Sequence, residues 1–180
     1  DPSPQKSQLG ANAILGVSLA AAHAGAAVRN VPLHQHFHDC LRAVSENANA
    51  FPQPRMPLPM TNMISGGLHA GHNLDFQDVL IMPVAAPDWH TGLEWIVRVY
   101  NRLGRLLIEA GHEARLVGDE GGYGPRLATN EQAIELVVSA IGAAGLRPGA
   151  DVTIALDVAA SHFYDGHSYP IKARAGVRVS

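Results

Sequence analysis

Three short apolar runs constrain the fold of this chain most strongly. They lie at residues 60–64, 79–83 and 152–156, and each is followed by polar or turn-forming residues. Runs of this length are typical of single β-strands and are too short for buried helices. Longer segments with helical periodicity separate the second run from the third. This alternation predicts an α/β fold in which helices cover a largely parallel sheet.

The two helices predicted after the second run carry their own start signals. One is expected at 88–110, with Asp88 as its N-cap and a stripe of apolar residues along one face. The other is expected at 129–145, where Thr129 and Gln132 form a capping box. The run at 152–156 then predicts a buried strand that ends on an aspartate. Functional groups in such folds gather at strand ends, so we expect the site there.

The first part of the chain has a different pattern. Residues 9–29 are rich in alanine and predict a helix, which ends before Pro32 because proline disfavours helix at the preceding residue. His34, His36 and His38 then occupy alternate positions. Three alternating histidines could bind a metal, but a half-exposed segment is the favoured interpretation.

Residues 45–59 are rich in proline and asparagine and are interpreted as a linker. We therefore predict two domains, at residues 1–50 and 51–180. The formal net charge of −3 argues against a nucleic-acid partner. Glycine, histidine and polar residues interrupt the apolar stretches, so no membrane span is expected. The single Cys40 excludes an internal disulfide and fits a reducing, cytoplasmic location.

Two loops concentrate titratable groups. The segment GDEGG at 118–122 places Asp119 and Glu120 between glycines, which let the backbone turn tightly and approach a ligand. The same composition is also ordinary for an exposed turn. A second loop, at 68–78, contains His69 and ends on Asp78. Either loop could supply an acid or a base.

Four separated motifs, taken together, resemble enolase, the phosphopyruvate hydratase of glycolysis. In the order of the family they are LGANAILGVS at 9–18, GGLHAG at 66–71, GDEGG at 118–122 and ALDVAAS at 155–161. The resemblance extends from about Lys6 to about Tyr164. It implies that residues 1–50 form the helical end of the N-terminal α+β domain. Residues 51–180 would then form the first part of a TIM-like barrel that opens strand-strand-helix-helix.

The resemblance also implies a reaction, the reversible dehydration of 2-phosphoglycerate to phosphoenolpyruvate with Mg²⁺ as cofactor. Removing a proton next to a carboxylate builds negative charge on two oxygens, and divalent cations stabilise that charge. The departing hydroxide must be protonated by a carboxyl held in its acid form. The expected partner is thus a small-molecule substrate, and a homo-oligomer is expected for full-length members of the family.

Site residues follow from their positions in the matched motifs. Glu120 corresponds to the acid that protonates the leaving hydroxyl, and His69 to the histidine of the loop that closes over the substrate. Asp157 corresponds to the first of three Mg²⁺ carboxylates. Asp78 stands where the family has a glutamate that helps to orient the leaving group. Its side chain is shorter by about 1 Å, and a misplacement of that size can cost about a hundredfold in rate.

An eight-stranded barrel takes about 250 residues, and only about half of that length follows the linker. We therefore expect an incomplete enolase that lacks the lysine base and two of the three Mg²⁺ carboxylates. The N-terminal loop whose serine helps to hold a second Mg²⁺ would precede Asp1. Residues 167–178 resemble no part of the family that can be placed. By itself, this chain is expected to have no hydratase activity.

Two other functions stay open. One is a non-catalytic enolase remnant or interaction module, which Asp78 and the divergent tail favour. The other is a hydrolase whose transition-metal site combines His69, His72, Asp75 and Asp78, because two histidines three residues apart can share a metal on a helix. A glycine-rich loop does not fix that geometry, which weakens the hydrolase hypothesis.

Overall fold

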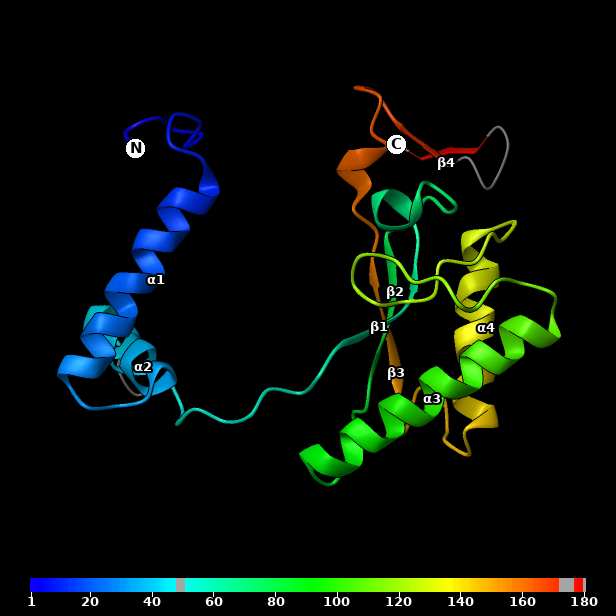
Figure 1. Cartoon of the computed structure of the whole chain (residues 1–180), viewed down its shortest axis with the longest axis horizontal. Coiled ribbons are helices and arrows are strands. Elements are labelled where there is room, and N and C mark those ends of the chain that lie inside the picture. The colour runs from blue at the N-terminus through cyan, green and yellow to red at the C-terminus, as the bar shows by residue number, and fades with distance from the viewer. Residues whose placement is uncertain (48–50, 172–176, 180) are drawn as a thin grey trace. The chain divides into compact units, whose positions relative to one another are not determined.

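The computed structural model describes residues 1–47, 51–171 and 177–179. Its Cα positions form two compact units, Asp1–Met56 and Pro57–Ser180, which are described separately below (Figure 1). We expected a domain boundary between residues 50 and 51, but residue 50 lies outside the described part of the chain. That boundary stays a prediction.

The first unit contains helices α1 (Ala11–Val28) and α2 (Leu33–Val44). Helix α1 matches the predicted alanine-rich helix. The segment with alternating histidines is half-exposed as predicted, with His34 exposed and His38 buried, and it is helical, because all three histidines lie within α2. A helix repeats every 3.6 residues, so alternate positions point in different directions. His36 packs against Gly25 of α1, whereas His38 is buried and contacts the carbonyl oxygen of Pro52.

Helix α1 is long and apolar enough to cross a membrane, judged by length and composition alone. Its 18 residues have a mean hydropathy of 1.5, and 6% of the segment is buried. The glycines and the histidine that interrupt this segment are outweighed by alanine, leucine and valine, so they do not exclude a span, and the expectation of no membrane span stays a prediction. One such helix is weak evidence for a membrane, since core helices of soluble proteins pass the same test.

The second unit is built on a three-stranded sheet in the order β1-β2-β3. The strands are β1 (Thr61–Ser65), β2 (Asp78–Met82) and β3 (Thr153–Asp157), and both pairs are antiparallel. The expected parallel arrangement was therefore wrong for these strands. The connection from β1 to β2 contains only the short 3₁₀ helix η2 (Gly67–Ala70), whereas a parallel pair needs a longer crossover, usually a helix.

Helices α3 (Trp89–Glu109) and α4 (Asn130–Ala143) pack on one face of this sheet (Figure 1). The largest fully buried hydrophobic side chains of this core are Met63, Ile64, Ile81, Val99, Leu103, Leu107, Val137, Ile141 and Val152. Burying each contributes about 1.5–3 kcal/mol. Strand β3 lies at the edge of the three-stranded sheet and its Leu156 is 42% exposed, so the prediction of a buried third strand was wrong.

Both predicted helix starts are confirmed by their caps. The Asp88 carboxylate accepts a hydrogen bond from the backbone N–H of Thr91 at 2.8 Å. The Thr129 hydroxyl accepts one from the N–H of Gln132 at 3.1 Å, and the Gln132 side chain accepts one from the N–H of Ala128 at 3.0 Å. The two sequence signals thus place the helices that cover the sheet.

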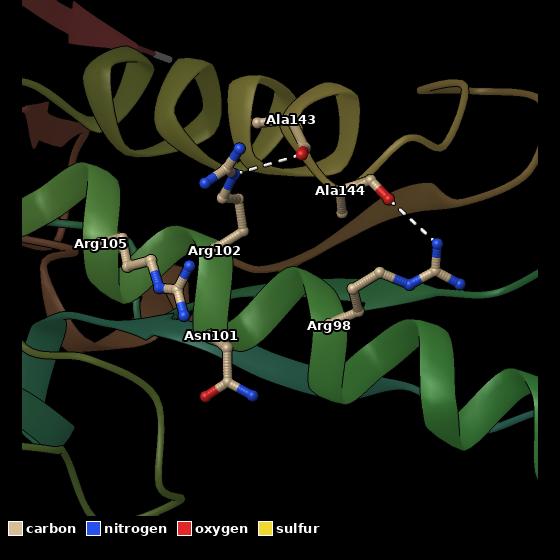
Figure 2. A pocket seen from close by; sticks show the side chains of 6 residues that line it. All are labelled: Arg98, Asn101, Arg102, Arg105, Ala143 and Ala144. Atoms are coloured by element: carbon tan, nitrogen blue, oxygen red, sulfur yellow. Dashed lines mark hydrogen bonds between the residues drawn. The ribbon is translucent and has the colours of Figure 1, made fainter.

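Two arginines of α3 bind the C-terminal end of α4 (Figure 2). Arg98 donates from Nη1 to the carbonyl oxygen of Ala144 at 3.1 Å, and Arg102 donates from Nε to that of Ala143 at 3.2 Å. The last carbonyls of a helix have no partner within the helix and carry partial negative charge. The arginines supply both the donors and the positive charge, which fixes α4 against α3.

The tail of the chain forms regular structure in its described parts. Strands β4 (Tyr169–Ile171) and β5 (Val177–Val179) pair antiparallel, after the 3₁₀ helix η3 (Ala160–His162). Part of the tail at 167–178, residues 172–176, lies outside the described residues.

Candidate active site

One end of the sheet gathers polar residues from all three strands. Strand β2 runs opposite to its neighbours, so its first residue, Asp78, pairs with Ser65 at the end of β1 and with Asp157 at the end of β3. The side chain of Asp78 is only 1% exposed. A buried carboxylate thus lies in the middle of a row formed by three strands.

The loop between β1 and β2 brings His69 to this row. His69 lies on η2, and its Nδ1 is 3.1 Å from Oδ2 of Asp78. The other carboxylate oxygen of Asp78 accepts a hydrogen bond from the Nδ2 amide of Asn62, which also donates to Ser65 Oγ at 3.0 Å. Each oxygen of Asp78 is thus held by a different side chain, and its orientation is fixed.

The GDEGG turn lies against the end of β1. The backbone N–H of Tyr123 donates to the carbonyl of Met63 at 2.9 Å, and the N–H of Ser65 donates to the carbonyl of Tyr123 at 2.8 Å. A Cβ at Gly118 would lie 2.5 Å from Cβ of Ser65, and one at Gly122 would lie 2.7 Å from Oδ1 of Asn62. Both distances are too short for any side chain, so the close approach requires glycine.

Two stacked tyrosines anchor the far side of the turn. The rings of Tyr100 and Tyr123 have centroids 4.3 Å apart, and the Tyr100 hydroxyl donates to the carbonyl of Gly121 at 2.8 Å. Burial raises the pKa of the Tyr123 hydroxyl to about 12, and Tyr100 adds to the effect. The Tyr123 hydroxyl therefore stays uncharged over the physiological pH range.

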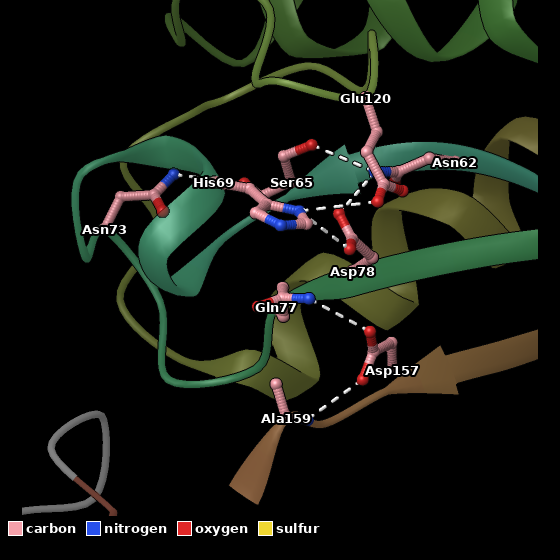
Figure 3. A network of polar contacts seen from close by, with 9 residues as sticks. All are labelled: Asn62, Ser65, His69, Asn73, Gln77, Asp78, Glu120, Asp157 and Ala159. Atoms are coloured by element: carbon pink, nitrogen blue, oxygen red, sulfur yellow. Dashed lines mark hydrogen bonds and ion pairs between the residues drawn. The ribbon is translucent and has the colours of Figure 1, made fainter. Parts of the chain in front are cut away.

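This anchoring places Glu120 beside His69 and Asp78 (Figure 3). Its Oε1 lies 3.9 Å from Nδ1 of His69, and its side chain is 53% exposed. The three ligand atoms of His69, Asp78 and Glu120 all lie within 4.8 Å of one another. An imidazole therefore lies between two carboxylates, one buried and one open to solvent.

Asp157 lies apart from this group, with Gln77 between them (Figure 3). Its carboxylate accepts hydrogen bonds from Nε2 of Gln77 and from the backbone N–H of Ala159, both at 3.0 Å. The amide oxygen of Gln77 is buried and has no hydrogen-bond partner among the described residues. Hard cations such as Mg²⁺ prefer oxygen ligands, so the exposed Asp157 carboxylate fits such an ion, and the amide nitrogen of Gln77 orients it.

The expected combination of His69 with His72 is not formed. Within the described part of the chain, only His69, Asp78 and Glu120 make a group of three possible metal ligands. His72 instead lines a small pocket of about 60 Å³, together with Asp75 and His162. The four-residue metal site of the hydrolase hypothesis is therefore wrong.

Some residues that build the site were not singled out from the sequence. Asn62 interrupts the apolar run at 60–64, and this polar residue in a strand was the signal that could have identified it. Asn73 donates to the carbonyl of Pro125 at 2.6 Å and so ties the His69 loop to the segment after the GDEGG turn. Asn130 accepts from the backbone N–H groups of two residues in that loop. No local pattern marks these last two contacts, because they span 52 to 55 residues.

Comparison with known families identifies both parts of the chain. Residues 53–177 match the model of the enolase C-terminal TIM barrel domain, and residues 1–37 match that of the enolase N-terminal domain. The barrel match covers more than half of the chain. It also continues beyond Tyr164, where the resemblance of the motifs ends, so residues up to 177 are part of the same domain match.

Proposed function

The chain belongs to the enolase family, and we propose that its barrel residues form the acid side of a site that interconverts 2-phosphoglycerate and phosphoenolpyruvate. The family domains support an enolase-like lyase, and such lyases are generally metal-dependent. One observation carries the proposal: His69, Asp78 and Glu120 come from separate segments and converge at one end of the sheet. Three of the four family motifs contribute to that end.

Glu120 is the proposed acid for the departing hydroxyl. Its carboxyl lies on a tight turn and is half-exposed, so it can reach a ligand above the end of the sheet. His69 is the nearest basic group, and its Nδ1 lies between the carboxylates of Glu120 and Asp78. A proton on this nitrogen reduces the repulsion between the two negative charges. His69 thus allows two carboxylates to share a small volume.

We assign Asp78 a positioning role. Its carboxylate is buried and both oxygens are engaged, one by His69 and one by Asn62. The side chain therefore holds the imidazole of His69 and does not contact a substrate above the site. The side chain of Asp78 is shorter than the family's glutamate. It fits this role because its carboxylate stays buried at the end of the sheet.

Asp157 is the proposed Mg²⁺ ligand, because its carboxylate lies at the end of β3 and is open to solvent. The ion, when bound, would supply positive charge for the enolate that forms when the substrate loses a proton. Gln77 orients the Asp157 carboxylate by donating to its Oδ2. One carboxylate holds a divalent ion weakly, so this chain alone is expected to bind Mg²⁺ poorly and to show no turnover.

The test is phosphoenolpyruvate formation by the protein expressed with all coding sequence that flanks residues 1–180. We expect turnover that Glu120→Gln lowers about 10²- to 10⁴-fold, the usual contribution of a general acid. Glu113→Gln, which changes an exposed carboxylate outside the site, should keep the wild-type rate. Equal rates for Glu120→Gln and wild type would refute the role of Glu120.

A non-catalytic enolase scaffold is the second candidate, and the observation that favours it is the engagement of both oxygens of Asp78. The same assay separates the two. A folded product without turnover, even in an Asp78→Glu variant that restores the family's residue, would establish the scaffold and contradict the lyase.

A further inference from the structure

The group of His69, Asp78 and Glu120 has the dimensions of a transition-metal site. Nδ1 of His69 lies 3.1 Å from Oδ2 of Asp78 and 3.9 Å from Oε1 of Glu120. A tetrahedral Zn²⁺ ion with bonds of about 2.1 Å holds its ligand atoms about 3.4 Å apart. The two distances lie on either side of this value, and no two of the three ligand atoms are more than 4.8 Å apart, so side-chain movements of about 1 Å would close the site around an ion.

We propose that these three residues bind one Zn²⁺ ion, at a site separate from the Mg²⁺ ligand Asp157. Zn²⁺ accepts imidazole nitrogen together with carboxylate oxygen, whereas Mg²⁺ prefers a set made only of oxygen. The nitrogen of His69 therefore favours Zn²⁺ over Mg²⁺. A water molecule completes the four-coordinate shell, as in zinc sites with three protein ligands.

Asp78 is the preorganised ligand. Its side chain is 1% exposed, and the amide of Asn62 holds Oδ1, which leaves Oδ2 directed at His69. Side chains that orient a metal ligand by a hydrogen bond, as Asn62 does here, typically change metal affinity about 10- to 100-fold. Binding by this carboxylate thus needs no rearrangement of the sheet.

The metal takes the place of a proton. A carboxylate oxygen can only accept, so the 3.1 Å contact between Nδ1 of His69 and Oδ2 of Asp78 assigns a hydrogen to Nδ1 in the free protein. On binding, the hydrogen leaves Nδ1 and Nε2 takes one from the solvent, so the imidazole stays neutral with one N–H, while the Nδ1 lone pair and the two carboxylates form bonds to Zn²⁺. Binding therefore changes the tautomer of His69, and no oxidation state changes.

Glu120 is the adaptable ligand. It is half-exposed on a turn between Gly118 and Gly121, and Gly121 has a φ of +83°. Its Oε1 is the farther of the two carboxylate oxygens from Nδ1 of His69, at 3.9 Å, and must move inward to bind the same ion. The open side of the turn also gives the ion a route from solvent.

Zn²⁺ binding does not depend on the proposed lyase activity. The two are linked in one respect only: a bound ion would occupy Glu120 and His69 and so inhibit the proposed acid. A failure of the lyase proposal leaves the metal site intact, because binding is measured without substrate.

The test is calorimetric titration of the 180-residue chain with Zn²⁺. We expect one ion per chain and at least tenfold weaker binding in His69→Ala and Glu120→Gln. Glu120 is exposed, so its variant should fold normally, which circular dichroism checks. Titration with Co²⁺ should give the visible absorption of a four-coordinate ion.

Three matched controls complete the test. Asp119→Asn, His72→Ala and Asp157→Asn should bind Zn²⁺ as tightly as the wild type. Loss of binding in His72→Ala or Asp157→Asn would place the ion elsewhere and overturn the proposal. Wild-type affinity in Glu120→Gln, or no binding to the wild type, would overturn it as well.

Discussion

Replacing Gly118 by alanine tests how the GDEGG turn reaches the end of β1. The new Cβ would lie 2.5 Å from Cβ of Ser65, 2.6 Å from its Oγ and 2.8 Å from the carbonyl oxygen of His69. Ordinary contacts of this kind are about 1 Å longer. Ser65 lies at the end of a strand, and the His69 oxygen belongs to the backbone. Because neither can easily move aside, the turn itself must move away.

The expected cost is about 1–3 kcal/mol in the free energy of unfolding, the usual range for overpacking a well-packed site. The same movement would carry Glu120 away from His69, so Zn²⁺ binding should weaken in parallel. Urea unfolding followed by tryptophan fluorescence gives the stability, since both tryptophans, Trp89 and Trp95, lie on α3 in the same unit.

Gly142→Ala is the matched control. Gly142 lies on α4, and a Cβ there would meet nothing within 4 Å. Alanine in place of an exposed helical glycine should raise the free energy of unfolding by about 0.5–1 kcal/mol. The two changes are chemically identical and should have opposite signs. Equal or greater stability in Gly118→Ala would refute the close approach of the turn to Ser65 and His69.

Two further predictions concern the second unit. Asp88→Ala should lower the free energy of unfolding by about 1 kcal/mol, because the N–H of Thr91 loses its acceptor, while Asp88→Asn should retain most of that stability; urea unfolding measures both. Arg147 lowers the pKa of Asp151 from 3.8 to about 2 by hydrogen bonds from its side chain and backbone. A lowered carboxyl pKa stabilises the fold above pH 3.8, and this contribution is lost as the pH falls towards 2. The stability difference between wild type and Asp151→Asn should therefore shrink from pH 5 to pH 2, and a difference that stays constant would contradict the pairing.

Local signals predicted the elements that depend on local interactions. The caps at Asp88 and Thr129 predicted the starts of α3 and α4, because a helix start is determined by hydrogen bonds within one turn. The three apolar runs predicted the strands to within one residue at each end. The direction of β2 was predicted wrongly, because strand length and hydrophobicity carry no information on direction.

In the candidate site, too, residues within local motifs were predicted, whereas those that act through distant contacts were missed. Glu120 and His69 were singled out because their loops carry family motifs rich in glycine. Asn62 was missed, since its role depends on Asp78, which is 16 residues away. Helix α2 was also missed, because the alternating histidines suggested a period of two, while the neighbouring apolar residues at helical spacing determine the fold.

The central claim is that His69, Asp78 and Glu120 form one site, and a double-mutant cycle on His69 and Asp78 tests it most directly. The free energy of unfolding is measured for His69→Ala, Asp78→Asn and the double variant, with a second cycle on His72 and Asp78 as the control. We predict a coupling of about 0.5–3 kcal/mol for His69 with Asp78, as for residues in contact, and none for His72 with Asp78. Additive effects of His69→Ala and Asp78→Asn would contradict the site described for this chain.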